Sequence, residues 1–233
     1  MKIISIVNPK GGAAKTVSAV NISYALINRG YKTLLIDTDP RGSVEIYLGL
    51  SNKNTIFELI KEQYEFFNIQ DLQKYITNKN GLDIITSNFN ITKIDKYFDT
   101  DIESELDSIS DIKYLFQNYD YVIFDTEGTV NNLTKAILKV TDYIFTPTQT
   151  SNIDINGIRD LLNTFKISKR KNHNLEVKKI FIVRAKTNTT AYKNYQQSSA
   201  VSNSVAYYEK VRNYTGALMA KGSATRSEYE QVN

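Results

Sequence analysis

The feature that most constrains this chain is a glycine-containing loop between an apolar run and a segment with helical spacing. The apolar run covers residues 3–7, and Pro-Lys-Gly-Gly-Ala-Ala-Lys-Thr follows at residues 9–16. A strand, a glycine turn and a Lys-Thr pair that opens a helix are the parts of a phosphate-binding loop. The backbone N–H groups of such a loop, with the positive end of the following helix, hold a chain of phosphates. We therefore expect Lys15 to reach the β- and γ-phosphates and Thr16 to place its hydroxyl on Mg²⁺.

Short apolar runs alternate with longer amphipathic segments along the rest of the chain. Strands are expected at 2–7, 33–37, 82–86, 121–125, 143–146 and 179–183. Helices are expected at 15–29, near 55–66, 101–118, 131–140 and 154–167, and within 187–204. This alternation predicts an α/β fold, with a mostly parallel twisted sheet and helices on both faces. Ligands of such sheets lie beyond the carboxyl ends of the strands, where Asp37, Asp125 and the phosphate loop all fall.

Three motifs together resemble those of the deviant Walker A family, the ParA-type and MinD-type ATPases. The loop at 10–16 resembles the family's KGGxGKT motif. Asp-Thr-Asp-Pro-Arg-Gly at 37–42 resembles its DxDPQG stretch, and Asp-Thr-Glu-Gly at 125–128 resembles its DTPG stretch. The resemblance implies a P-loop NTPase fold that binds ATP or ADP with Mg²⁺. We expect residues 1–233 to form one such domain, with no N-terminal DNA-binding extension.

The resemblance also implies roles for individual residues. It implies that the nucleotide is bound by the loop residues Lys10, Gly11, Gly12, Ala13, Ala14, Lys15, Thr16 and Val17. Thr16, Asp37 and Asp125 would serve the metal, with Asp125 acting through water and Asp37 near the metal's water shell. Asp39 would help to position the attacking water. Lys10 would reach the phosphates held by a second subunit, like an arginine finger, and so couple hydrolysis to dimerisation.

Three residues depart from the family motifs. Ala14 stands in place of a glycine, Arg41 in place of a glutamine and Glu127 in place of a proline. If residue 14 needs a positive φ, alanine there costs on the order of 1 kcal/mol. We then expect ATP binding to weaken by somewhat under tenfold and hydrolysis to be slow. Glu127 could be a stray surface charge, a group that repels ATP or a partner for a basic residue.

Charge is distributed unevenly along the chain. Residues 1–159 carry 16 Lys/Arg and 20 Asp/Glu, whereas residues 160–233 carry 13 Lys/Arg and 5 Asp/Glu. Such asymmetry indicates a polyanionic partner, with an ordinary solvated face as the alternative. The resemblance favours non-specific DNA, bound through a surface that includes Arg184, Lys193, Arg212 and Lys221. The basic residues between 166 and 179 are interpreted instead as helix-end charge complementarity and a source of solubility.

Composition excludes several classes of protein. The chain has no cysteine, which excludes disulfides, iron–sulfur clusters and the nitrogenase iron protein branch of the family. A single histidine, His173, does not favour a zinc site. The chain begins in a strand without a signal peptide, and it has no apolar stretch approaching the ~20 residues of a membrane span. We expect a cytoplasmic, nucleoid-associated protein.

The favoured function is that of a small ParA-type partition ATPase. Such a protein forms an ATP-bound homodimer, binds DNA non-specifically and works with a separately encoded, ParB-like centromere-binding protein. A MinD-type ATPase is one alternative, although residues 223–230 lack the basic amphipathic face of a membrane helix. An ATPase that positions some other cargo is a second alternative. A third is a hydrolysis-impaired scaffold that switches through nucleotide binding alone.

Overall fold

The structure is a computed structural model that describes residues 1–66, 71–96, 113–149, 152–183 and 203–205. The strands of these residues form one eight-stranded sheet in the order β3-β4-β2-β5-β1-β6-β7-β8. Their bounds are β1 Lys2–Ile6, β2 Thr33–Asp37, β3 Thr77–Lys79, β4 Leu82–Ile85, β5 Tyr121–Asp125, β6 Tyr143–Thr148, β7 Glu176–Val183 and β8 Asn203–Val205. Each neighbouring pair is parallel except β3 with β4.

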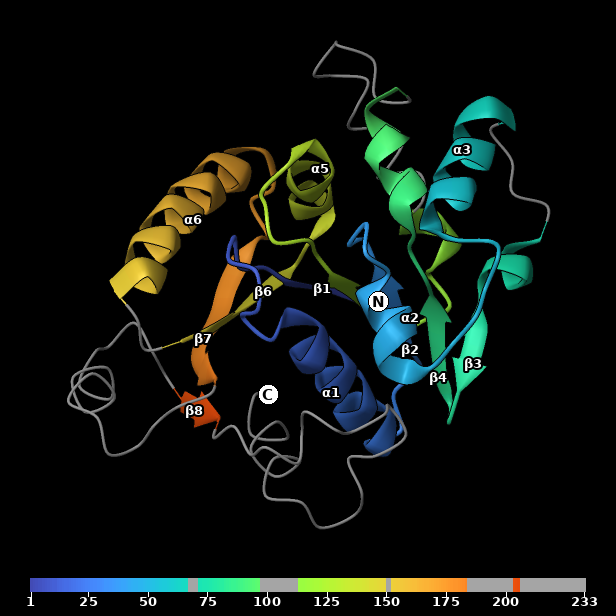
Figure 1. Cartoon of the computed structure of the whole chain (residues 1–233), viewed down its shortest axis with the longest axis horizontal. Coiled ribbons are helices and arrows are strands. Elements are labelled where there is room, and N and C mark those ends of the chain that lie inside the picture. The colour runs from blue at the N-terminus through green and yellow to red at the C-terminus, as the bar shows by residue number, and fades with distance from the viewer. Residues whose placement is uncertain (67–70, 97–112, 150–151, 184–202, 206–233) are drawn as a thin grey trace.

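Helices cover both faces of this sheet (Figure 1). They are α1 Lys15–Asn28, α2 Ser43–Leu48, α3 Ile56–Phe66, α5 Asn132–Val140 and α6 Asn152–Lys171, with 3₁₀ turns η1 Leu72–Tyr75 and η2 Phe89–Lys96. Helices α3, α5 and α6 lie on one face, whereas α1 and α2 lie on the other. The fold class predicted from the sequence is confirmed.

The two faces follow from the alternation of side chains along each strand. Ile3 of β1 packs into the cluster under α3 and α5, and its neighbour Ile4 packs into the cluster under α1 and α2. Central strands are therefore apolar at successive positions, and all five residues of β2 are buried. Each isoleucine or leucine buried in this way contributes roughly 1.5–3 kcal/mol.

The central strands lie close to the positions predicted from the sequence, and the differences lie mainly at the edges. Strand β7 begins at Glu176, before the predicted start at 179, and β6 continues to Thr148. Helix α2 and the antiparallel strand β3 were not predicted. Residues 203–205 form β8 where a helix was expected, and residues 187–202 lie outside the described part. Of the helix predicted at 101–118, residues 113–115 are helical, whereas 101–112 lie outside the described part.

The register of the central strands brings the predicted carboxylates together. Asp37 ends β2 and Asp125 ends β5, and the two residues are direct partners across these parallel strands. Ile6 of β1, from which the phosphate loop departs, is the partner of Asp125 on its other side. The loop and both carboxylates therefore lie at one edge of the sheet, as predicted.

Candidate nucleotide-binding site

The loop after β1 curls tightly before it enters α1. Gly12 has φ +74°, and Ala14 has φ 60° and ψ 29°, the left-handed conformation that L residues rarely adopt. Ala14 is the N-cap of α1 and supplies no side-chain cap. The first-turn N–H groups of α1 thus donate no hydrogen bond to the side chain of this residue, and such groups are available to an anion.

Lys15 lies beneath this loop. Its side chain is buried, and Nζ donates a hydrogen bond to the carbonyl oxygen of Lys10 at 3.1 Å. Burial lowers the pKa of Lys15, while the charges of Asp125 and Asp39 act in the opposite direction. A buried ammonium surrounded by carboxylates and a curled backbone is suited to hold a phosphate.

Asp37 anchors the loop that follows β2. One carboxylate oxygen accepts a hydrogen bond from the backbone N–H of Asp39 at 2.8 Å, and the other accepts one from Val44 at 2.9 Å. Burial, followed by the charge of Asp125, raises the pKa of Asp37 well above its usual value. Both oxygens of Asp37 thus have backbone partners. The predicted place of Asp37 near the metal's water shell stays a prediction.

Asp125 differs from Asp37 in having no such partners. Both carboxylate oxygens are buried and lack a well-formed hydrogen bond in the described part of the chain, although the Thr16 hydroxyl acts on the group as a hydrogen-bond donor. Burial raises its pKa to about 7, against the opposing effects of the Thr16 hydroxyl and the Lys15 charge. A buried carboxylate with so little hydrogen bonding is costly, so the site favours occupation by a cation or its bound water.

These groups fit Mg²⁺ of the kind that accompanies a nucleotide. Thr16 and Asp125 offer the oxygen ligands that Mg²⁺ prefers. In the described residues, no group of three or more His, Cys, Asp or Glu side chains could hold a metal ion. A Mg²⁺ ion here would depend on water and phosphate oxygens for the rest of its shell, as is usual for nucleotide-bound magnesium.

Asp39 is paired with Arg41, the residue that replaces the family's glutamine. The guanidinium donates from Nε to Oδ1 at 3.2 Å and from Nη2 to Oδ2 at 3.0 Å. The backbone N–H of Arg41 adds a third hydrogen bond, at 2.9 Å to Oδ1. Burial opposes ionisation of Asp39, but Arg41 and then Lys15 outweigh it and lower the pKa of Asp39. The predicted water-positioning residue is thus ionised and held by its neighbour.

A pocket of about 380 Å³ opens between the phosphate loop and the segment that follows β2. Its lining consists of Gly12, Ala13, Ala14, Lys15, Thr16, Val17, Asp39, Arg41, Ser43, Ile46 and Tyr47. Six of the eight residues predicted to bind nucleotide therefore surround one space. Ile46 and Tyr47 add an apolar border from α2 that the sequence analysis did not predict.

Two other segments contact the phosphate loop in ways that the sequence analysis did not predict. Gln149, just beyond β6, donates from Nε2 to the carbonyl oxygen of Gly12 at 2.9 Å. Gly128 passes so close that a Cβ on it would lie 3.4 Å from the backbone nitrogen of Gly11. A glycine in the 125–128 motif was visible in the sequence, whereas nothing marked Gln149.

Glu127 lies near the cations of the pocket. Its carboxylate accepts a hydrogen bond from the Thr129 hydroxyl, and its charge raises the pKa values of both Lys15 and Arg41. These are secondary effects, since burial dominates for Lys15 and Asp39 dominates for Arg41. Of the three interpretations, partnership with basic residues receives electrostatic support, without a direct ion pair to either cation.

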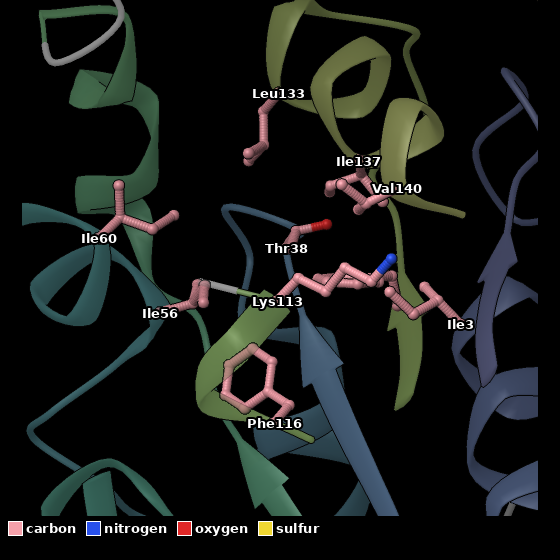
Figure 2. A pocket seen from close by; sticks show the side chains of 10 residues that line it. Ile3, Thr38, Ile56, Ile60, Lys113, Phe116, Leu133, Ile137 and Val140 are labelled. Carbon is pink, nitrogen blue, oxygen red and sulfur yellow. The ribbon is translucent and has the colours of Figure 1, made fainter. Parts of the chain in front are cut away.

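A second hollow lies on the other face of the sheet and has a different character. Figure 2 shows it between α3 and α5, with the side chains of Ile60, Leu133 and Ile137 around it. Its volume is about 10 Å³, which is the space of roughly one water molecule. The Thr38 hydroxyl beside it donates to the backbone oxygen of Asp125. This hollow is a packing gap too small for a nucleotide.

Comparisons with known proteins agree with this geometry. A family model described as an AAA domain, AAA_31, matches residues 1–177. The sporulation initiation inhibitor protein Soj of Bacillus subtilis is 28% identical over 185 residues, which cover 78% of this chain and 72% of Soj. An uncharacterized protein of Methanocaldococcus jannaschii, MJECL24, is 31% identical over 76% of this chain and 70% of its own length. The chain belongs to the AAA_31 family of ParA/MinD-type P-loop ATPases.

Solved structures extend the comparison to almost the whole chain. A putative plasmid partition protein from Borrelia burgdorferi, bound to AMPPNP, is 25% identical with a TM-score of 0.77 and covers 99% of this chain and 95% of its own. Cobyrinic acid a,c-diamide synthase from Mycobacterium smegmatis, with bound ADP and magnesium, has a TM-score of 0.81. It covers 99% of this chain and 91% of its own, and at 17% identity it shows the fold alone.

The remaining predictions fall partly outside the described residues. Arg184, Lys193, Arg212 and Lys221, the predicted DNA-binding residues, all lie there. Lys10 contacts Lys15 through its backbone oxygen, and its action on a second subunit stays a prediction. In the described part of the chain, none of the helices is long and apolar enough to cross a membrane.

Proposed function

We propose that this protein is a partition-type ATPase that binds ATP with Mg²⁺, dimerises in that state and binds DNA without sequence preference. The observation that carries the proposal is Asp125, a buried carboxylate without a well-formed hydrogen bond among the described residues, which the Thr16 hydroxyl approaches beside the phosphate loop. A metal–nucleotide complex would satisfy each of these groups. The named relatives support the partition role, since they include chromosome partitioning proteins ParA and a plasmid partition protein.

The residues of the pocket have distinct tasks in phosphoryl transfer. The loop N–H groups and Lys15 bind the phosphates, and Thr16 with Asp125 would hold Mg²⁺, which would supply positive charge against the transferred group. Asp39 positions the attacking water. Lys10 is supplied from the second subunit and stabilises the charge that develops in the transition state. Hydrolysis and dimerisation are therefore coupled.

Dimerisation is tested by light scattering with ATP, with ADP and with no nucleotide. The wild type should form dimers with ATP and Mg²⁺ and remain mainly monomeric with ADP. Lys10→Ala should lose the ATP dimer. Lys32→Ala is the matched control, because Lys32 is an exposed lysine beside the amino end of β2, at the opposite edge of the sheet from the pocket. An ATP dimer that survives the loss of Lys10 would refute the role of Lys10 across the interface.

DNA binding is tested by measuring affinity against salt concentration on unrelated duplexes. The excess of Lys and Arg in residues 160–233 motivates this test. The logarithm of affinity should fall with the logarithm of salt concentration, with a slope of about −0.9 for each neutralised phosphate. Arg212→Ala should weaken binding about equally on all sequences, whereas Lys32→Ala should not. Binding to a single sequence, or binding that ignores salt, would contradict the model.

A nucleotide-driven switch with little hydrolysis is the second candidate function. Two observations favour it: the left-handed Ala14 in the phosphate loop and the pairing of Asp39 with Arg41. Single-turnover measurement of ATP cleavage in the DNA-bound dimer separates the candidates. Cleavage that DNA and the centromere-binding partner accelerate supports the ATPase, whereas stable ATP under the same conditions supports the switch.

A further inference from the structure

Arg41 occupies an unusual position between a carboxylate and an open pocket. Two guanidinium nitrogens contact Asp39, whose side chain is 5% exposed, yet the side chain of Arg41 itself is 69% exposed. Arg41 also lines the pocket with the phosphate loop. Its charged end is thus held on one side by Asp39 and faces the space that a nucleotide would occupy.

The two cations of the pocket lie close enough to influence each other. The charge of Arg41 lowers the pKa of Lys15, although less strongly than burial does. Lys15 extends from the start of α1 and Arg41 from the segment after β2, so they belong to different elements that border the pocket. Two cations arranged around one space are suited to receive an anion between them.

Asp39 cannot serve Arg41 and an attacking water equally well at the same time. Arg41 contributes three hydrogen bonds to its two oxygens. A guanidinium forms the same two-point contact with phosphate oxygens as with a carboxylate. The guanidinium itself is largely exposed, so a phosphate in the pocket can reach it and compete with Asp39 for it.

We propose that Arg41 exchanges Asp39 for the terminal phosphate of bound ATP, and that this exchange releases Asp39 to position water. The inference rests on the proposed function, in which Asp39 stands beside the terminal phosphate. With ADP in the pocket there is no terminal phosphate at this place, and Arg41 stays on Asp39. Arg41 therefore distinguishes ATP from ADP, and it leaves Asp39 able to position water only when ATP is bound.

Equilibrium binding of fluorescent ATP and ADP analogues tests this inference on the full chain. Arg41→Gln, which restores the family's residue, should weaken ATP binding about tenfold and change ADP binding by less than about twofold. Arg41→Lys, which keeps the charge and loses the two-point contact, should lie between. Arg29→Gln is the control, because it removes the same charge at the C-cap of α1, at the other end of that helix from the pocket.

The alternative results separate the inference from the proposed function. An unchanged ratio of ATP to ADP affinity in Arg41→Gln would overturn the inference, while wild-type nucleotide binding would leave the proposed function standing. Tighter ATP binding in Arg41→Gln would also overturn it and would make Arg41 a permanent restraint on Asp39. A wild-type protein that binds neither nucleotide would overturn the proposed function and the inference together. Thermal unfolding of each variant verifies that the protein still folds. The substitutions leave the backbone N–H of residue 41 in place, so its hydrogen bond to Asp39 can still form.

Discussion

Replacing Ala14 with glycine should stabilise the protein and leave its affinity for nucleotide almost unchanged. Ala14 has φ 60° in the folded loop, so the strain of the left-handed conformation belongs to the folded state and opposes folding. We therefore predict an effect on stability in place of the weaker ATP affinity expected from the sequence. Because the loop is already curled, Ala14→Gly should alter affinity by less than about twofold.

The magnitude follows from three opposing effects. Glycine releases strain of about 1.5 kcal/mol, the middle of the range for a left-handed L residue. It loses a half-buried methyl worth about 0.4 kcal/mol, since Ala14 packs against the cluster under α1 and α2. It also gains freedom in the unfolded chain, which opposes folding by about 0.6 kcal/mol. The net gain is about 0.5 kcal/mol, which should raise Tm by about 1–2 °C.

Thermal unfolding of the nucleotide-free protein measures this effect, with Ala13→Gly as the matched control. Ala13 is 1% exposed and is not among the described residues with positive φ. Its replacement removes a methyl and adds freedom without releasing strain, and should destabilise the protein by roughly 1–2 kcal/mol. The two neighbouring substitutions should therefore shift Tm in opposite directions. If Ala14→Gly lowers Tm as far as Ala13→Gly does, the argument from backbone strain is wrong.

Two further predictions concern stability. Gly42→Ala should destabilise the protein by about 2 kcal/mol or more, because Gly42 has φ +61° and a Cβ on it would lie 2.9 Å from the carbonyl oxygen of Ser87. Gly49→Ala should cost only about 1 kcal/mol in urea unfolding, because Gly49 has φ +63° in open space, and equal losses would refute the steric argument. The second prediction is that the free energy of unfolding falls as pH rises from 5.5 to 8. Burial raises the pKa of Asp125 to about 7, so the folded protein binds more protons in this range than the unfolded chain does. Asp125→Asn should weaken that dependence and stabilise the metal-free protein at pH 8; an unchanged pH profile would contradict it.

The sequence predicted the parts of the fold in which local pattern and burial agree. Buried strands such as β2 and β5 are continuous apolar runs, and the phosphate loop carries its own motif. The edge hairpin of β3 and β4 was missed although Asn80 and Gly81, with φ 52° and +86°, form the Asn-Gly turn that signals a hairpin. Strand β3 has only three residues, none of them apolar, so its pattern gave no sign of a strand.

The sequence predicted which residues belong to the site, but not what those residues contact. Motif spacing located Asp37, Asp39 and Asp125 at strand ends, but it could not distinguish their surroundings. Asp37 faces backbone donors, Asp39 faces a guanidinium, and Asp125 has no well-formed hydrogen bond in the described residues and is approached by the Thr16 hydroxyl. These differences depend on side-chain conformation and on chain segments far apart in sequence. The charge of Arg41 was visible in the sequence, whereas its pairing was not.

The hydrogen bonds of Asp37 have a consequence for how quickly the site can respond. Its carboxylate joins the end of β2 to the following turn at Asp39 and to the first turn of α2 at Val44. These two hydrogen bonds fix the main chain that carries Asp39, so the side chain of Asp39 can change its torsions without a rearrangement of that main chain. Rotation of an exposed side chain takes picoseconds to nanoseconds, far faster than a loop rearrangement. An asparagine at this position has one acceptor atom in place of two, and the turn would lose one of its two fixed points.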